Sequence, residues 1–381
     1  MPATILADLV RFPSLPATPN AALMGHIRDH LATLDVDSTL IPVPEGDRFN
    51  LFATIGPRDV PGYILSGHSD VVSTEGQVWQ SDPFTLHEQD GRLYGRGTSD
   101  MKGFLACALA MVPRFQAMAL RRPIHLAFSC DEEIGCRGVG AMIDRLPDLC
   151  APPLGAIIGE PSNLRPVLAH KGKCALALEF EGVAGHSSEP AKGENALYPA
   201  AELLLFIADL NRRLASEGPF DPRFSPPSST CQAGTIHGGA AVNIIPERAV
   251  IEFELRAIPG VSPAALSQPV IDRLEELGHT AQAQGRKLSV RWREMSSYPA
   301  LPPCEDAGFV TLVEEFSGRS ALASVSYGTE AGLYHQAGIP SIICGPGDIA
   351  QAHRPDEFIL RSQLDECCAM LNRLGQHLCA A

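Results

Sequence analysis

Hydrophobic residues in the first part of the chain form short runs that alternate with helical stretches. Residues 63–65, 123–128 and 155–158 are apolar runs of strand length, bounded by Gly, Pro, Ser or Asp. Residues 103–114 are apolar over a length typical of a buried helix. Strands that alternate with helices are typical of a mostly parallel sheet with helices on both faces. We therefore expect an α/β fold here.

A tight turn is indicated between residues 85–87 and 92–94. Asp90-Gly91 separates these two short strand-like segments. Asp-Gly is a preferred pair for a two-residue hairpin turn of type I′, because both positions need a positive φ. The pattern predicts a β-hairpin.

The middle of the chain shows a different order of elements. Its apolar periodicity predicts strand, helix, strand, strand, helix, strand over residues 174–180, 196–214, 231–236, 249–256, 263–284 and 288–292. This order is typical of a ferredoxin-like α+β sandwich, with helices on one face of an antiparallel sheet. The α/β pattern resumes near residue 298, with a strand at 341–344. We predict a catalytic domain of residues 1–172 and 298–381, with an inserted domain of residues 173–297.

Composition narrows the classes of protein. A chain of 381 residues is long enough for two domains. The longest apolar stretch, residues 104–112, is too short to cross a membrane, and no basic leader precedes an apolar run. Eleven scattered cysteines without a C-x-x-C pair indicate reduced thiols and a cytoplasmic location. The net charge of −14 argues against nucleic acid or an anionic membrane as a partner.

Two segments carry isolated candidates for metal ligation. His68 and Asp70 follow a strand and point the same way, so that the carboxylate could fix the second nitrogen of a ligating imidazole. Asp100 lies among glycines just before the apolar helix. Taken alone, a polar strand end explains the first pair and a helix cap explains Asp100.

Three later segments repeat the arrangement. Residues 131–133 are consecutive carboxylates after a buried strand, Glu160 follows the next strand, and His353 follows the strand at 341–344. A solvated acidic loop would explain residues 131–133 equally well.

The combination is more specific than its parts. The carboxyl ends of strands in an open α/β sheet converge on one crevice, so these five segments should meet. Imidazoles and carboxylates without cysteine suit two divalent ions, with Zn²⁺ the first choice and Co²⁺ or Mn²⁺ as alternatives. The expected ligands are a bridging Asp100, His68 and Glu160 on one ion, and Glu133 and His353 on the other. Three carboxylates, two divalent ions and a bridging hydroxide sum to zero charge.

Glu132 remains without a metal in this arrangement. It lies next to Glu133 and therefore close to the bridging position. A general base must lie there to take a proton from the attacking water and return it to a leaving amine. We predict this role for Glu132, and we expect Asp70, which can fix the imidazole of His68, to be a second catalytic residue.

Several segments of the chain, in this order, resemble one family. They are Ser-Gly-His68-Ser-Asp70-Val-Val, Tyr-Gly-Arg-Gly-Thr-Ser-Asp100-Met-Lys-Gly, Asp-Glu132-Glu133-Ile-Gly, Ile-Gly-Glu160-Pro and the late His353. The family is that of the dinuclear metallo-aminoacylases and carboxypeptidases, which contains acetylornithine deacetylase, succinyl-diaminopimelate desuccinylase and carboxypeptidase G. The resemblance covers nearly the whole chain and implies a hydrolase that acts on a small N-acyl amino acid.

The resemblance also implies further roles. The inserted domain is expected to act as a lid and to form a homodimer, with His186 stabilising the oxyanion in the partner's active site. Substrate contacts are implied for Asn243, Arg256 and the segment Gly328-Thr329-Glu330.

Tyr327-Gly-Thr-Glu330-Ala-Gly and Cys-Gly-Pro-Gly-Asp-Ile-Ala-Gln-Ala-His353-Arg-Pro-Asp-Glu-Phe resemble the acetylornithine deacetylase branch of the family. The expected reaction is therefore hydrolysis of N2-acetylornithine in arginine biosynthesis. A desuccinylase or another aminoacylase is the alternative, and a metal-stabilised binding protein without turnover is a third class. Glu132 distinguishes the third class, because it has no structural task in an inert centre.

Overall fold

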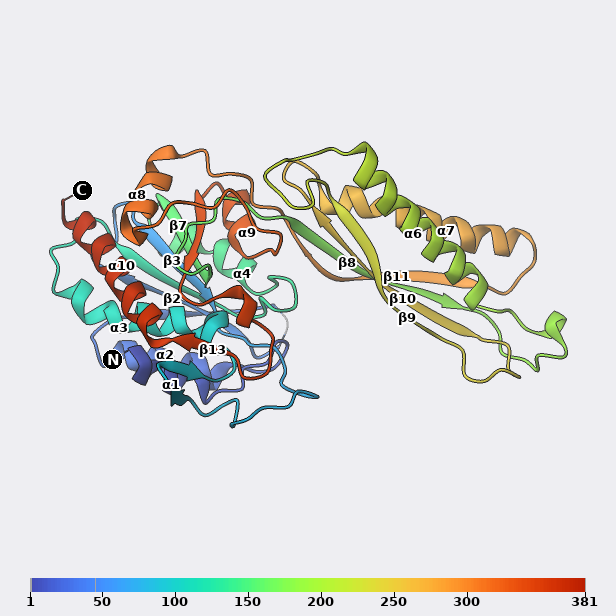
Figure 1. The fold of residues 1–381 in the computed structure, drawn as a ribbon, viewed down its shortest axis with the longest axis horizontal. Coiled ribbons are helices and arrows are strands. Elements are labelled where there is room, and N and C mark those ends of the chain that lie inside the picture. Colours follow the sequence, from blue (N-terminus) through green and yellow to red (C-terminus); the bar gives the residue numbers. More distant parts are fainter. Residues whose placement is uncertain (1, 45, 381) are drawn as a thin grey trace. The chain divides into compact units, whose positions relative to one another are not determined.

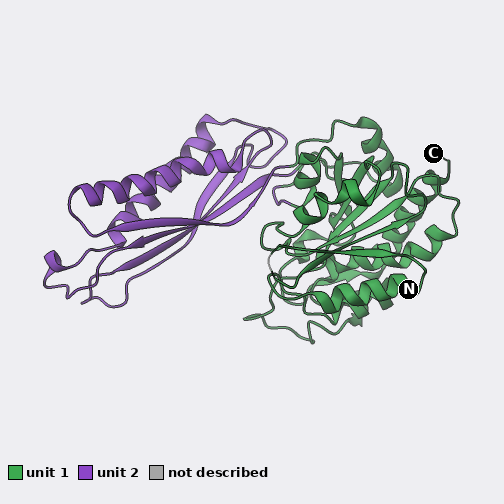
Figure 2. Cartoon of the chain, turned by 180° about the vertical axis from the view of Figure 1, so that it is seen from behind, with its two compact units in different colours: residues 1–169, 301–325, 329–381 green, residues 170–300, 326–328 purple. Residues whose placement is uncertain are grey.

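The computed structural model describes residues 2–44 and 46–380 and divides into two compact units, shown in Figure 2. Unit 2 comprises His170–Ala300 and Ser326–Gly328, and unit 1 comprises the rest of the chain. The boundaries predicted at 172/173 and 297/298 lie within three residues of this division. The assignment of residues 326–328 to unit 2 was not predicted.

Unit 1 is built around a six-stranded sheet (Figure 1). In spatial order its strands are β1 (Ser38–Pro42), β2 (Phe49–Ile55), β6 (Ile124–Ser129), β3 (Tyr63–His68), β7 (Gly155–Pro161) and β12 (Ser341–Gly345). The last four pair in parallel, whereas β1 and β2 add to the edge antiparallel. The predicted mostly parallel α/β fold is confirmed. The edge strands β1 and β2 were not predicted.

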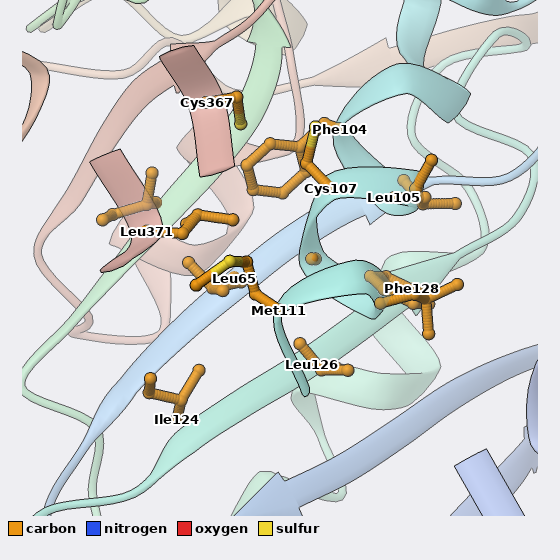
Figure 3. Close-up of a cluster of buried hydrophobic side chains, with 14 of the residues drawn as sticks. Leu65, Phe104, Leu105, Cys107, Met111, Ile124, Leu126, Phe128, Cys367 and Leu371 are labelled. Atoms are coloured by element: carbon orange, nitrogen blue, oxygen red, sulfur yellow. The ribbon is translucent and has the colours of Figure 1, made fainter. Parts of the chain in front are cut away.

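Helices cover both faces of this sheet, and the alternation of side chains along each strand shows why. Leu65 on β3 belongs to a hydrophobic core with α3 (Gly103–Gln116) and α10 (Arg361–Ala380), part of which is shown in Figure 3. Its neighbour Ile64 points to the opposite face and belongs to a separate core with α4 (Val139–Ile143) and α9 (Ala331–Gln336). Buried strands with two apolar faces read as continuous apolar runs, as the sequence does.

The remaining elements of unit 1 surround this sheet. They are helices α1 (Pro2–Val10), α2 (Ala21–Ala32), α5 (Leu146–Leu149) and α8 (Ala307–Ser317), the helical turns η1 (Thr98–Lys102) and η3 (Ile349–Gln351), and the small sheet β4 (His87–Gln89), β5 (Arg92–Tyr94) and β13 (Phe358–Leu360). Asp90 and Gly91 join β4 to β5 with φ of 50° and 73°. Both angles are positive, so the predicted type I′ hairpin is confirmed.

Unit 2 has the predicted β-α-β-β-α-β order. Its elements are β8 (Gly172–Glu181), α6 (Leu197–Glu217), β9 (Thr230–Gly238), β10 (Arg248–Ala257), α7 (Pro263–Ala283) and β11 (Ser289–Tyr298), with a short turn η2 (Pro190–Lys192). The strands lie in the order β11-β8-β10-β9 and all pair antiparallel. Helices α6 and α7 pack side by side on one face, over a core that includes Leu176, Leu178 and Phe180 (Figure 1). This confirms the ferredoxin-like sandwich.

No helix within residues 2–44 and 46–380 combines the length and the apolar character that a membrane span needs.

Candidate metal centre

His68 is the last residue of β3, and its imidazole is almost fully buried, with 1% exposed. Its Nε2 lies 3.0 Å from Oδ1 of Asp100 and 3.8 Å from Oε1 of Glu160. Its Nδ1 lies 2.9 Å from the backbone carbonyl of Asp70 and 3.7 Å from the carboxylate of that residue. The carbonyl is therefore the acceptor that fixes the ring, which leaves Nε2 directed at the carboxylates.

The carboxylate of Asp70 holds a neighbouring loop. It accepts hydrogen bonds from the backbone N–H groups of Glu132 at 3.2 Å and Glu133 at 3.1 Å. Burial raises the pKa of Asp70 to about 6, while the two N–H groups favour the charged form. Asp70 therefore orients His68 through its backbone and both glutamates through its side chain.

Asp100 lies between the two histidines. Its Oδ1 faces His68, and its Oδ2 lies 3.4 Å from Nε2 of His353. Burial would raise the pKa of Asp100, but the hydrogen bonds from His353 and His68 outweigh it and keep that pKa below its usual range. Asp100 lies in η1, directly before α3 as expected from the sequence, and not at the end of a strand like His68. One carboxylate with an oxygen toward each histidine has the arrangement of a bridging ligand.

His353 forms the exposed flank of the cluster, with 56% of its side chain accessible. Its Nε2 lies 3.0 Å from Oε2 of Glu133. Hydrogen bonds to Asp100 and Glu133 raise the pKa of His353 to about 10. His353 lies in a loop after η3 rather than directly at the end of β12, and its φ of 64° is in the left-handed region that non-glycine residues rarely adopt.

The cluster contains more carboxylate charge than its histidines balance. One ligand atom each from His68, Glu132 and Glu160 lie within 4.8 Å of one another, as do atoms of His68, Asp100 and Glu133. Burial, with Glu133 and other nearby carboxylates, raises the pKa of Glu132 to about 8. Burial and Asp100 raise the pKa of Glu160 well above its usual value. These oxygen and nitrogen donors fit divalent cations, whose charge would allow every carboxylate to ionise.

Asp131, the first of the three consecutive carboxylates, is kept apart from this cluster. It is 2% exposed, forms a buried ion pair with Arg48 and accepts a hydrogen bond from the backbone N–H of Ala17 at 2.8 Å. The alternative of a solvated acidic loop is therefore wrong. Arg48 was not among the predicted residues, because no local pattern links it to a loop 83 residues away.

Unit 2 carries three other predicted residues. An isolated β-bridge joins His186 to Ile244, and the backbone N–H of Ser187 donates to the carbonyl of Asn243 at 3.1 Å, so His186 and Asn243 lie on neighbouring segments. Nδ1 of His186 accepts the backbone N–H of Ser188 at 3.2 Å. In the neutral ring the proton is then on Nε2, which is available as a donor.

Arg256 lies on β10 and is already engaged within unit 2. Its Nε donates to Oε1 of Glu254 at 2.8 Å, and its Nη1 donates to the hydroxyl of Tyr298 at 2.7 Å. Its Nη2 takes part in neither hydrogen bond. The side chain is 27% exposed, and the two hydrogen bonds hold its guanidinium in a fixed orientation.

The predicted segment Gly328-Thr329-Glu330 is packed closely. A side chain at Gly328 would collide with the ring of Tyr298. Thr329 and Glu330 are 0% and 1% exposed, and the carboxylate of Glu330 accepts a hydrogen bond from Ser66 at 3.4 Å. Both side chains support packing within unit 1 in this structure, and their contact with substrate stays a prediction.

Comparison with known proteins adds to this geometry. The model of peptidase family M20/M25/M40 matches residues 64–377, which include the whole cluster. The chain belongs to this family. It is accordingly a metal-dependent hydrolase of the M20 type, and its cluster provides groups of residues able to hold divalent metal.

Two similar curated proteins have the same name. The acetylornithine deacetylase of Photorhabdus laumondii is 34% identical over 385 residues, covering 98% of this chain and 96% of the relative. The acetylornithine deacetylase of Proteus mirabilis is 35% identical over 391 residues, with the same coverage.

Solved structures share the fold of this chain. A metallo-carboxypeptidase from Sulfolobus solfataricus aligns with a TM-score of 0.78 at 17% identity, covering 100% of this chain and 99% of that protein. A tripeptidase from Staphylococcus aureus aligns with a TM-score of 0.76 at 19% identity, covering 100% and 98%.

Proposed function

We propose that this M20 enzyme hydrolyses N2-acetyl-L-ornithine to L-ornithine and acetate, as a step in arginine biosynthesis. The cluster around Asp100 carries the proposal of amide hydrolysis, because its carboxylates and imidazoles match the donor set of a two-metal hydrolase. The choice of substrate is supported by relatives of nearly the same length that are named acetylornithine deacetylase.

The proposed centre holds two divalent ions, with Zn²⁺ the first choice and Co²⁺ or Mn²⁺ the alternatives. Asp100 would contribute to holding both ions, His68 and Glu160 would hold one of them, and Glu133 and His353 would hold the other. Bound ions would supply Lewis acidity, which polarises an acyl carbonyl and lowers the pKa of water.

Glu132 is proposed as the general base and acid. Its carboxylate takes a proton from the attacking water, and the same carboxyl returns that proton to the nitrogen of the leaving amine. The hydrogen bond from its backbone N–H to Asp70 and the contact of its Oε1 with the thiol of Cys136 at 3.3 Å fix its position. Burial beside other carboxylates raises the pKa of Glu132, and the positive charge of bound ions would lower it again, so that the carboxylate is ionised and can accept a proton near neutral pH.

Unit 2 is proposed to supply the residues that recognise the substrate. A guanidinium held by Glu254 and Tyr298 can grip the α-carboxylate of an N-acyl amino acid, and this is the role proposed for Arg256. Asn243 is proposed as a further substrate contact. His186 is proposed to donate from Nε2 to the oxyanion formed in the partner subunit of a homodimer.

The decisive experiment measures acetate release from N-acetylornithine by purified protein with added Zn²⁺ or Co²⁺. N-succinyl-diaminopimelate and N-acetylmethionine serve as competing substrates in parallel assays. We expect the highest kcat/KM with N-acetylornithine and no turnover after exhaustive chelation. Preference for the succinyl substrate would identify a desuccinylase, preference for N-acetylmethionine a different aminoacylase, and no turnover with any of them an inert metal-binding protein.

A further inference from the structure

Two fully buried charged residues of unit 1 have no part in the reaction proposed above. Arg96 is 1% exposed and Glu357 is 0% exposed, and they form an ion pair at 2.8 Å. Arg96 follows β5 and Glu357 precedes β13, so the pairing of Tyr94 with Phe358 brings them together from positions 261 residues apart. A buried ion pair alone is weak evidence of a role, because desolvation offsets much of its attraction. The other partners of these residues are more informative.

Glu357 binds the turn that carries the bridging aspartate. Its Oε1 accepts the backbone N–H groups of Ser99 at 2.8 Å and Asp100 at 3.0 Å. Its Oε2 accepts the backbone N–H of Gly97 at 2.9 Å, in addition to Arg96. The carboxylate therefore fixes the backbone at Asp100 itself and at Gly97 and Ser99, which precede it.

Arg96 and Gln77 bind the loop that carries the exposed histidine. Arg96 donates from Nη1 to the carbonyl of Arg354 at 3.2 Å and from Nη2 to Oε1 of Gln77 at 2.6 Å. Gln77 in turn donates from Nε2 to the carbonyl of His353 at 2.9 Å. A non-glycine residue stays in the left-handed region only where its surroundings hold it there, and these hydrogen bonds do so for His353.

We infer that Gln77, Arg96 and Glu357 form a positioning clasp that sets the distance between Asp100 and His353 and thereby tunes metal affinity. The inference rests on the metal centre of the proposed function. Asp100 and His353 come from separate loops, and the three residues of the clasp link these loops by hydrogen bonds to backbone groups. None of the three side chains contacts a carboxylate or imidazole of the proposed centre through these bonds, so they act on metal binding through their neighbours.

The first test replaces Glu357 by Gln and measures metal binding to the apoprotein. Cobalt is titrated into the protein while its visible absorption is recorded, and affinity is obtained by competition with a chelator. An amide nitrogen cannot accept the N–H groups that the carboxylate accepts. Because Asp100 faces both histidines, we expect both ions to bind about 10- to 100-fold more weakly, with an altered absorption spectrum.

The second test uses Gln77→Leu, which keeps the volume but removes the amide from the edge of the clasp. Here we expect about a tenfold loss of affinity for one ion and no change for the other, because Gln77 contacts the backbone of His353 alone among the proposed ligands in the described part of the chain. If Glu357→Gln does not fold, as judged by circular dichroism, this variant decides the question.

The matched control is Glu88→Gln. Glu88 pairs with Arg361 at 2.6 Å in the same unit, but both side chains are about half exposed. Wild-type binding is expected for this variant. Wild-type affinities and spectra in both clasp variants, or an equal loss in the control, would overturn the inference. No substrate is present in these titrations, so a failure to hydrolyse N-acetylornithine would overturn the proposed function and leave the clasp unaffected.

Discussion

The candidate functional residues of the two units differ in how their charges are balanced. In unit 1, His68 and Asp100 are buried among carboxylates whose negative charges repel one another. These carboxylates need additional positive charge before all of them can ionise. In unit 2, Arg256 is paired with Glu254, and the exposed His186 can donate a hydrogen bond from its Nε2. A site that lacks positive charge suits metal-dependent catalysis, whereas accessible hydrogen-bond donors that are held in place suit the recognition of substrate. The following predictions test this division.

The largest effect is expected from Glu132→Gln in unit 1. The variant should bind metal with wild-type stoichiometry, because Glu132 is not one of the proposed ligands. Its kcat should fall by about 10²- to 10⁴-fold, since an amide cannot take the proton of the attacking water. Metal content by elemental analysis and steady-state kinetics check both points. Turnover near the wild-type value in a metal-loaded variant would assign proton transfer to another group.

A somewhat smaller effect is expected from His186→Ala in unit 2. Removing one oxyanion donor typically costs about 10²- to 10³-fold in kcat. Mixing this variant with Glu132→Gln under conditions of subunit exchange separates the two units directly. If His186 acts on the partner's centre, one site of each heterodimer contains neither lesion, and activity should return. Verified exchange without recovery would place His186 outside the partner's active site.

Arg256→Lys should give a modest effect that depends on the substrate. A lysine retains the charge but cannot make the two parallel hydrogen bonds of a guanidinium with a carboxylate. We expect kcat/KM for N-acetylornithine to fall about 10-fold or more, while the methyl ester loses much less. Parallel assays on acid and ester measure this ratio. Equal losses on both would remove the α-carboxylate as the group that Arg256 binds.

The smallest effect is expected on the free energy of unfolding, through the buried carboxyl group of Glu330 in unit 1. Burial raises the pKa of Glu330 to about 7, so the folded state holds a proton that the unfolded state loses above its ordinary pKa. Stability should therefore fall as pH rises from about 4.5 to about 7, by about 3 kcal/mol at most. Urea unfolding of chelated wild type and Glu330→Gln at pH 5 and pH 8 checks this. The wild type should lose more stability than the variant, and parallel losses would show that Glu330 is ionised at both values.

The sequence allowed much of the framework to be predicted, because the relevant signals are local. Apolar runs located β3, β6, β7 and β12, and the Asp90-Gly91 pair located a hairpin. The order of elements in unit 2 followed from periodicity alone. The edge strands β1 and β2 were not predicted from the apolar pattern, although they complete the main sheet.

The supporting contacts of the cluster could not be predicted in the same way. The backbone carbonyl of Asp70, rather than its carboxylate, holds the ring of His68, which depends on local backbone geometry. Arg96 and Glu357 lie within segments used for the family resemblance, yet their partnership requires the pairing of β5 with β13. A contact between two single residues far apart in the chain produces no periodic pattern in the sequence, so it cannot be predicted from one sequence.

The pairing of the first and last strands of unit 2 has a consequence for how such a chain can be rearranged. Lys173 on β8 lies opposite Tyr298 on β11, so the main segment of unit 2, His170–Ala300, begins and ends at neighbouring points. A segment whose ends lie together can be inserted into a host loop, or removed from it, with little cost in loop-closure entropy. Unit 2 therefore has the topology of a domain that can be inserted into another chain or deleted from this one. A short linker between Ala169 and Leu301 would be the natural design for a chain in which the α/β unit is made to fold without it.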